Sequence, residues 1–441
     1  MNLLIPKGRS RYLFYSLFAL IILLLFLNYA LQISIPSVVI IAVLVLAAFL
    51  GDKDEIISVC VCCIAWSEAI KWHYVVIFCC IILIMKYGKK IKLDFGFIPF
   101  ILIIIWEFLH CFSSGANVKS MVAYMFLYIL FILIIFTRDM KTIDYSFIMR
   151  TFAIVVFGVC CILILRLLIH SNFNFEMAFM EMLRLGLTDE EIGGLVINPN
   201  SLGVLCVLAV GCLLQIRSAG EKKPVDLFLI ICILISGALT CSRTYLACLL
   251  ILCLFLLFTS KGGLKKKLKF LLGSIIVLLI SVSLLYIVFP ETLDMFIQRL
   301  NVEDITSGRE ALFYAYNSYL LSSAKAFIWG VGSLTLGEKV LQLSMSNVPH
   351  NGVQEILVAW GIIGLVLFVA MIFVLIRRSK QENPNQAWAN YALLIVLLAK
   401  IMVGQVITSN YTMLAFVLIY LSLCQECTGK NDTEQKFINR V

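Results

Sequence analysis

Apolar runs without charges recur from one end of the chain to the other, separated by short polar segments. We place fourteen membrane spans near residues 12–31, 33–50, 56–70, 72–86, 97–112, 121–137, 147–169, 199–216, 225–241, 244–260, 270–289, 352–376, 388–406 and 409–424. Runs of about 20 apolar residues match the hydrocarbon thickness of a bilayer. The third and fourth runs are short and could form one re-entrant hairpin, which leaves twelve spans. The pattern predicts an all-α, polytopic membrane bundle of 12–14 transmembrane helices.

The basic residues are grouped in the short segments between spans. Clusters fall at residues 86–92, 138–141, 217–223, 261–269 and 377–380. If the spans alternate in direction, these clusters and both chain ends lie on one face, which the positive-inside rule makes cytoplasmic. Two longer segments, 170–198 and 290–349, are then extracytoplasmic, as is the turn near 241–244. No small-residue cleavage site follows the first run, so we expect it to be an uncleaved span.

The composition excludes several classes of protein. Of the 441 residues, 62% are hydrophobic and 14% are charged, which is incompatible with a soluble domain. The net charge of +9 lies in loops that set topology, so it does not indicate a nucleic-acid partner. Almost all of the 16 cysteines lie in apolar runs, where cysteine acts as a small apolar side chain. We therefore expect no metal site, no cofactor and no disulfide framework.

Arg243 is the only charge between Leu227 and Ser260, and it lies in a turn between two apolar runs. An arginine without a partner at membrane depth costs a few kcal/mol. The residue therefore has two interpretations. It is either a turn residue that reaches lipid headgroups, or an anion site in which the guanidinium, with its neighbour Ser242, binds phosphate or carboxylate.

The longest polar segment contains a helix-start motif. Ser307 followed by Glu310 forms a capping box, which predicts a helix that runs to about Ala326. Arg309 would lie in the first turn, where a cation is unfavourable for the helix dipole unless an anion such as phosphate binds there. The alternative is a solvated arginine that pairs with Glu310 or Glu303.

A second polar motif, Pro349-His350-Asn351-Gly352, directly precedes an apolar run. Histidine titrates near neutrality and can accept a proton from a sugar hydroxyl. His350 is therefore a candidate base and Asn351 a candidate substrate ligand; the alternative is a histidine that caps a span at the interface. We assign interfacial roles to the other three histidines, His73, His110 and His170.

Further polar residues lie near the same boundary. Asn198 and Asn200 flank Pro199 at the start of a span, which indicates either a capped helix start or a ligand-facing site. Arg166 lies one or two turns inside the boundary of its span, with Lys400 as its counterpart in a later span. Each could snorkel outward or serve a binding cavity. We include Asn198, Asn200 and Arg166 among the candidate substrate-binding residues.

Taken in order, these motifs resemble the O-antigen ligase and O-antigen polymerase superfamily of integral-membrane glycosyltransferases. The resemblance rests on NPNS, CSRTY, SGRE, a Trp-Gly-x-Gly turn and PHNGVQEILVAWGIIGLVLF, and it covers about residues 195–375. We divide the chain accordingly into N-terminal spans (1–194), a ligase- or polymerase-like core with a loop at 290–350 (195–375), and C-terminal spans with a cytoplasmic tail (376–441).

The resemblance implies a specific chemistry and location. Its members transfer glycans from undecaprenyl pyrophosphate, without a metal, to an acceptor at the outer face of the bacterial cytoplasmic membrane. The family's functional arginines would fall on Arg243 and Arg309, and its loop histidine on His350. The implied partners are the lipid-linked glycan donor, a glycan or lipid acceptor, a chain-length regulator and a flippase.

Three functions are compatible with the pattern. We favour a polymerase of surface polysaccharide such as O-antigen or capsule, because the extracytoplasmic segments are moderate in size and no acceptor-specific domain is appended. A ligase that passes finished glycan to another acceptor is the nearest alternative. A transporter of lipid-linked glycan should place charges near the bilayer midplane and often has two related halves. Here the notable charges cluster on one face, and we find no internal repeat.

Overall fold

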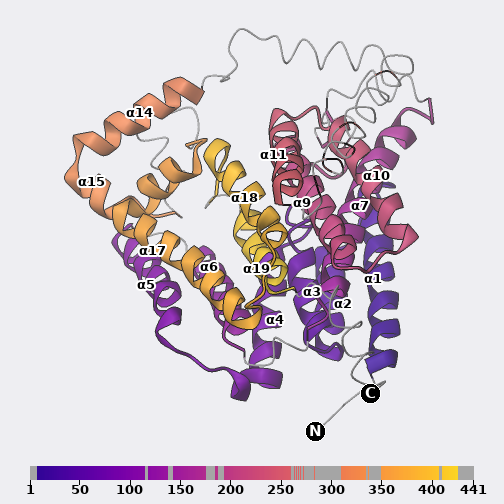
Figure 1. The fold of residues 1–441 in the computed structure, drawn as a ribbon, viewed down its shortest axis with the longest axis horizontal. Helices are drawn as coiled ribbons and strands as arrows, with labels where there is room; N and C mark the ends of the chain where they lie inside the picture. The colour runs from indigo at the N-terminus through magenta and orange to yellow at the C-terminus, as the bar shows by residue number, and fades with distance from the viewer. Residues whose placement is uncertain are drawn as a thin grey trace.

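The computed structural model describes residues 7–114, 118–137, 143–174, 184–186, 193–259, 309–333, 349–406 and 410–425, together with Leu336 and six single positions between 263 and 283. Every regular element in these residues is a helix, and one isolated β-bridge joins Ile91 and Thr137. The fold is thus an all-α polytopic membrane bundle, as the apolar pattern predicts (Figure 1).

The described helices follow the apolar runs closely. The α-helices of the first half are α1 (Lys7–Tyr29), α2 (Ser37–Leu50), α3 (Lys53–Cys62), α4 (Trp72–Tyr87), α5 (Ile98–Ser114), α6 (Val118–Ile135) and α7 (Tyr145–His170). Those of the second half are α9 (Pro199–Ser218), α10 (Pro224–Leu239), α11 (Arg243–Thr259), α14 (Arg309–Ser322), α15 (Ala324–Trp329), α17 (Gly352–Glu382), α18 (Ala392–Val403) and α19 (Asn410–Cys424). Short 3-10 turns are η1 (Gly88–Lys90), η2 (Phe95–Phe97) and η4 (Trp388–Tyr391).

Six of the described helices are long and apolar enough to cross a membrane, and six shorter apolar helices accompany them. The third predicted span, 56–70, needs correction. Only Lys53–Cys62 forms a helix there, and turns follow it. A ten-residue helix is about 15 Å long, roughly half of the hydrocarbon thickness. Helix α3 is thus too short to cross a bilayer, whereas the stretch Trp72–Lys90, which contains α4, is one of the six that are long enough. The predicted span at 270–289 lies outside the fully described residues.

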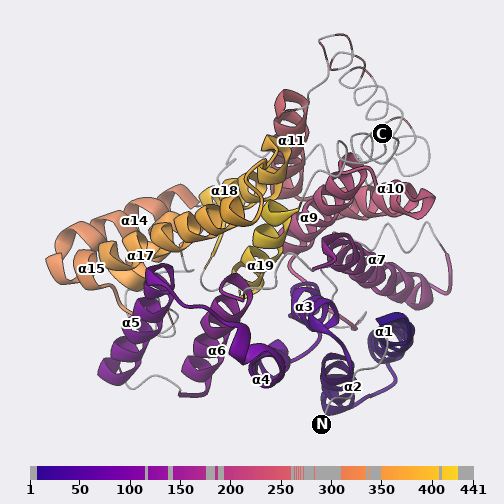
Figure 2. The same cartoon turned by 60° about the horizontal axis from the view of Figure 1, so that its bottom comes forward.

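Helix α9 lies near the middle of the bundle, as Figure 2 shows, and packs against α7, α10, α11 and α18. It is the most deeply buried of the long apolar helices. Close approach is possible because small residues meet large neighbours: Gly203 lies against Tyr245, and Gly211 lies against Leu252 and Leu393. The central helix therefore joins the α10–α11 turn to the C-terminal helices.

Helix α17 is broken about one third of the way along its length. Gly361 has φ 67° and ψ −171°, which separates an N-terminal part, residues 352–360, from the rest of the helix. The turn after α15 enters this break: the amides of Val331 and Gly332 donate to the carbonyls of Val358 and Ala359 at 2.9 and 2.7 Å. A helix break needs an identifiable cause. Here the amides of the loop turn donate to two carbonyls that directly precede the break.

Substituting Gly361 with alanine should destabilise the protein measurably. The positive φ alone costs about 1–3 kcal/mol for a side-chain-bearing residue, and the new Cβ would overlap the backbone of Ile328 and Trp329. Thermal unfolding in detergent should show a lower midpoint. Gly220→Ala isolates the φ contribution, because Gly220 has φ 103° and open space around it. Gly263→Ala, also in open space, should have no effect. Equal midpoints for the Gly361 and Gly220 variants would contradict the packing argument.

Candidate functional site

Hydrogen bonds of Ser242 fix the turn that carries Arg243. Ser242 accepts the amide of Tyr245 at 3.2 Å and donates its own hydroxyl to Oδ1 of Asn200 at 2.7 Å. Cys241 has φ 46°, a left-handed conformation that a cysteine rarely adopts. Such strained positions concentrate at functional sites. Arg243 begins α11 at this fixed turn, and its side chain is half-buried.

A second arginine, Arg184, binds the same turn. Its Nε donates to the carbonyl of Thr240 at 3.0 Å, and its Nη2 donates to Oδ1 of Asn200 at 3.1 Å. Our sequence reasoning did not select Arg184. A signal was present, because it is the only basic residue between His170 and Asn198. The structure therefore brings two predicted residues, Asn200 and Ser242, together with a guanidinium that the motifs did not reveal.

The predicted residues Asn198 and Asn351 both cap helices. Asn198 accepts the amide of Asn200 at 2.9 Å at the start of α9. Asn351 accepts the amides of Val353 and Gln354 at 3.0 and 3.1 Å at the start of α17. Side-chain caps of this kind satisfy the free N–H groups of the first helical turn. Both asparagines thus have a structural task, and substrate binding by them stays a prediction.

His350 lies beside the C-terminal end of α18. It is half-buried and directly precedes Asn351, whose Nδ2 donates to the carbonyl of Met402 at 3.1 Å. Glu355, one turn into α17, accepts the amide of Val406. The start of α17 is therefore fastened to the residues that close α18.

Arg243 lies toward the same end of α18. Leu252 of α11 and Leu393 at the start of α18 meet at Gly211, whereas Lys400, near the end of α18, lies close enough to Cys248 to act on it electrostatically. The two helices therefore run antiparallel, and the C-terminal end of α18 lies at the Arg243 end of α11. His350 and Arg243 thus approach this end of α18 from different helices.

Helix α14 brings the backbone of Arg309 to the same region. Gln354, in the first turn of α17, donates to the carbonyl of Phe313 at 2.8 Å and to Oδ1 of Asn317 at 2.9 Å. Arg309 lies one helical turn before Phe313, and His350 lies the same number of residues before Gln354. The predicted capping box at Ser307 lies outside the described residues, so the cap stays a prediction.

The helices of this segment bury part of their apolar side chains, whereas Phe313 and Phe327 are 41% and 40% exposed. Tyr316 and Leu320 are buried, and burial raises the pKa of the Tyr316 hydroxyl to about 12. The predicted single helix to about Ala326 is instead two helices, α14 and α15, because Ser323 interrupts the first and caps the second by accepting the amide of Ala326 at 3.3 Å. In Figure 1 both helices lie along the N-terminal part of α17.

Two further basic residues have buried positions. Arg166 is 8% exposed; it donates to the carbonyl of Ala30 at 3.5 Å and lies against Gly194, so it belongs to the side of the bundle formed by α1 and α7. Lys400 donates to Thr412 at 2.6 Å and to the carbonyl of Gln405, so it closes the end of α18. A binding role for Arg166 stays a prediction. Among the described residues, no group of three or more His, Cys, Asp or Glu side chains could hold a metal ion.

The starts of α11 and α17 thus lie at one end of α18, and α14 packs against the start of α17. Residues 228–369 match the family model of the O-antigen ligase. A search of curated proteins found no match.

The O-antigen ligase match confirms the resemblance to the O-antigen ligase and polymerase superfamily. The matched residues contain Arg243, Arg309 and His350, and also Ser242 and Asn351. Arg184 and Asn200 precede the match but contact the turn within it. The O-antigen ligase match and the apolar helices together support a multi-pass membrane protein that polymerises or ligates glycans.

Proposed function

We propose that this protein transfers glycans from undecaprenyl-pyrophosphate-linked oligosaccharide repeat units and so polymerises a surface polysaccharide, such as O-antigen or capsule, at the outer face of the bacterial cytoplasmic membrane. The observation that carries the proposal is the approach of Arg243 and His350 to one end of α18, with α14, which begins at Arg309, bonded to the start of α17, all within the O-antigen ligase match. The distribution of basic residues in the sequence supports an extracytoplasmic position for this end.

The chemistry is a single displacement. A hydroxyl oxygen of the acceptor attacks the anomeric carbon of the donor sugar, the bond from that carbon to the pyrophosphate oxygen breaks, and the acceptor proton passes to a ring nitrogen of His350. Negative charge grows on the departing undecaprenyl pyrophosphate. Guanidinium groups fixed in advance stabilise such charge, more strongly where water is excluded. Arg243 and Arg309 serve this role, and inversion at the anomeric carbon follows from one displacement.

The alternatives differ in their products. We would give the purified protein lipid-linked repeat units alone and separate the products by size. A ladder of growing glycans supports the polymerase. A single shift in size that appears only after another acceptor is added supports the ligase. Movement of the intact lipid-linked glycan across vesicles, with no transfer to any acceptor, would replace both with the transporter.

Arg184 lies outside the sequence motifs and allows an independent test of the site. Arg184→Ala removes hydrogen bonds to Thr240 and Asn200, so the Arg243 turn should loosen and turnover should fall about tenfold to a hundredfold, at about 1.4 kcal/mol for each factor of ten. Arg184→Lys should restore little, because one ammonium does not reproduce the planar fork. Turnover and donor affinity would be measured on reconstituted protein. A lysine variant with wild-type turnover would show that only charge matters at this position.

A further inference from the structure

Glu107 is a buried acidic residue that the proposed chemistry does not use. It is the only acidic residue in the apolar helix α5 and is 2% exposed. A carboxyl group in a membrane-spanning segment is expensive, and such residues usually have a function and an identifiable partner. The hydrogen-bond partners of Glu107 lie more than 220 residues away in the sequence. They are Ser333, in the turn after α15, and Trp360, in α17.

Oxygen Oε1 of Glu107 accepts two hydrogen bonds at the break in α17. One donor is the backbone amide of Ser333 at 3.2 Å, and the other is the indole Nε1 of Trp360. The neighbouring residue Trp106 donates its own indole to the carbonyl of Trp360 at 3.0 Å. One turn later, a ring nitrogen of His110 lies 3.1 Å from the carbonyl oxygen of Trp329. Three side chains of α5 therefore hold both the loop turn and the broken helix.

His110 also corrects a sequence-based prediction. We assigned it an interfacial role, whereas it is 3% exposed and its ring contacts both Trp106 and Trp329. The ring of His110 adds a second polar contact between α5 and the turn at residues 329–333.

The turn at 329–333 connects the two elements that carry predicted catalytic residues. On one side it follows α15 and α14, which begins at Arg309. On the other side it is hydrogen-bonded through Val331 and Gly332 to residues 358 and 359, in the part of α17 that begins beside His350. Displacement of this turn would therefore change the position of Arg309 relative to His350.

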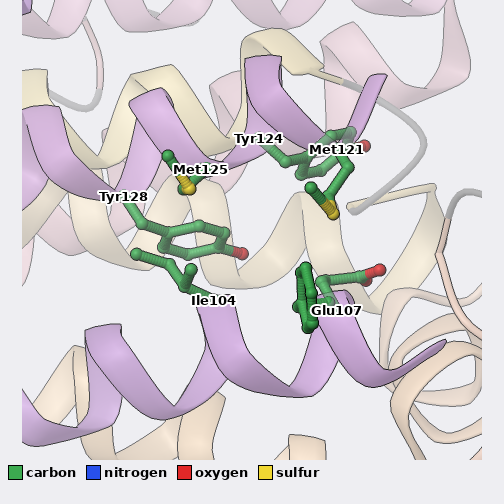
Figure 3. A pocket seen from close by; sticks show the side chains of 7 residues that line it. Ile104, Glu107, Met121, Tyr124, Met125 and Tyr128 are labelled. Carbon is green, nitrogen blue, oxygen red and sulfur yellow. The ribbon is translucent and has the colours of Figure 1, made fainter. Parts of the chain in front are cut away.

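The second oxygen of Glu107 has a different environment. Within the part of the chain that the structure describes, Oε2 has no hydrogen-bond partner, and neither has the Tyr128 hydroxyl, although both are buried. Figure 3 shows Glu107 and Ile104 of α5 facing Tyr124, Met125 and Tyr128 of α6 across the cavity that they line. The cavity volume is about 20 Å³, which is room for one water molecule. Among the described residues, the hydrogen bond from Glu107 to the turn is therefore made through Oε1, an acceptor.

We propose that Glu107 is a positioning residue for glycosyl transfer: its Oε1 anchors the turn at 329–333 in the break of α17 and so sets the position of Arg309 relative to His350. The proposal rests on the proposed function. Because the anchor is an acceptor, glutamine can replace glutamate through its amide oxygen, whereas leucine leaves two donors in the protein interior without an acceptor.

The experiment compares Glu107→Leu, Glu107→Gln and Tyr128→Phe in protein reconstituted into vesicles. The first readout is trypsin cleavage after Lys325, an exposed residue of α15 next to the turn, and it does not depend on glycosyl transfer. The second is kcat and KM for the lipid-linked donor. Glu107→Leu should cleave at least fivefold faster and lose about tenfold to a hundredfold in kcat, with a smaller change in donor KM. Glu107→Gln should restore both readouts. Tyr128→Phe changes the same cavity without touching the turn and should match the wild type.

Trp360→Phe is a second variant if Glu107→Leu does not fold. It keeps an aromatic ring but loses the indole donor, so both readouts should move in the same direction by less. The proposal is overturned if Glu107→Gln is as impaired as the leucine variant, if cleavage does not change in the leucine and Trp360 variants, or if cleavage accelerates at wild-type kcat. Faster cleavage without glycosyl transfer in any protein, the wild type included, would instead reject the proposed function and with it the positioning role, leaving only a structural anchor.

Discussion

Arg243→Ala is expected to lower the rate of glycosyl transfer by at least about 10²–10³-fold, while the protein still inserts into the membrane and folds. The magnitude is typical for the loss of one fixed group that stabilises charge in the transition state. The fold should survive because the hydrogen bonds from Ser242 and Arg184 to Asn200 hold the turn without the Arg243 side chain. The measurement is turnover of lipid-linked repeat units by purified, reconstituted protein.

The form of the side chain at position 243 should also matter. Arg243→Lys keeps the charge but not the bidentate fork, so it should recover only part of the activity. Arg309→Ala should resemble Arg243→Ala, since both arginines are assigned to the leaving pyrophosphate.

The matched control for Arg243 is Arg377→Ala, an exposed arginine in the C-terminal part of α17, far along that helix from His350. It should transfer glycan at the wild-type rate. Wild-type rates in the Arg243 and Arg309 variants would remove the pyrophosphate role from both arginines. Equal losses in the Arg243 and Arg377 variants would show a general dependence on surface charge.

The apolar pattern predicted most of the helices, because an uncharged run of sufficient length has few other solutions in a bilayer. It did not predict the break in α17. The run from residue 352 to 376 continues without a charge after Glu355, and only the turn at 329–333 reveals why Gly361 is there. A break that depends on hydrogen bonds from another part of the chain leaves little trace in local periodicity.

The sequence predicted the candidate site only in part, because contacts between distant residues leave no local pattern. Arg243 and His350 are conspicuous because they are polar residues beside apolar runs. Their proximity to one end of α18 depends on the contacts of Asn351 with Met402 and of α11 with α18, which no spacing encodes. Arg184 and Glu107 were missed because their partners are distant in sequence. For Glu107, the signal was a single carboxylate in an apolar helix.

His350→Ala is expected to lower kcat by about 10²–10⁴-fold, the usual range for loss of a general base, and to change donor affinity little. The small effect on affinity follows from the assignment of the donor pyrophosphate to the arginines. The start of α17 should be preserved, because the cap belongs to Asn351 and the link to α14 belongs to Gln354. Donor binding and turnover would be measured separately on the same preparation.

Added imidazole distinguishes proton transfer from a structural contribution of His350. A small base that enters the space left by the side chain should restore part of the turnover of His350→Ala, with a dependence on imidazole concentration. His170→Ala is the matched control, since it removes a histidine at the end of α7, outside the O-antigen ligase match, and it should behave as wild type. An unchanged kcat in His350→Ala would exclude His350 as the base. A loss that imidazole does not restore, together with weaker donor binding, would instead assign His350 to binding the donor.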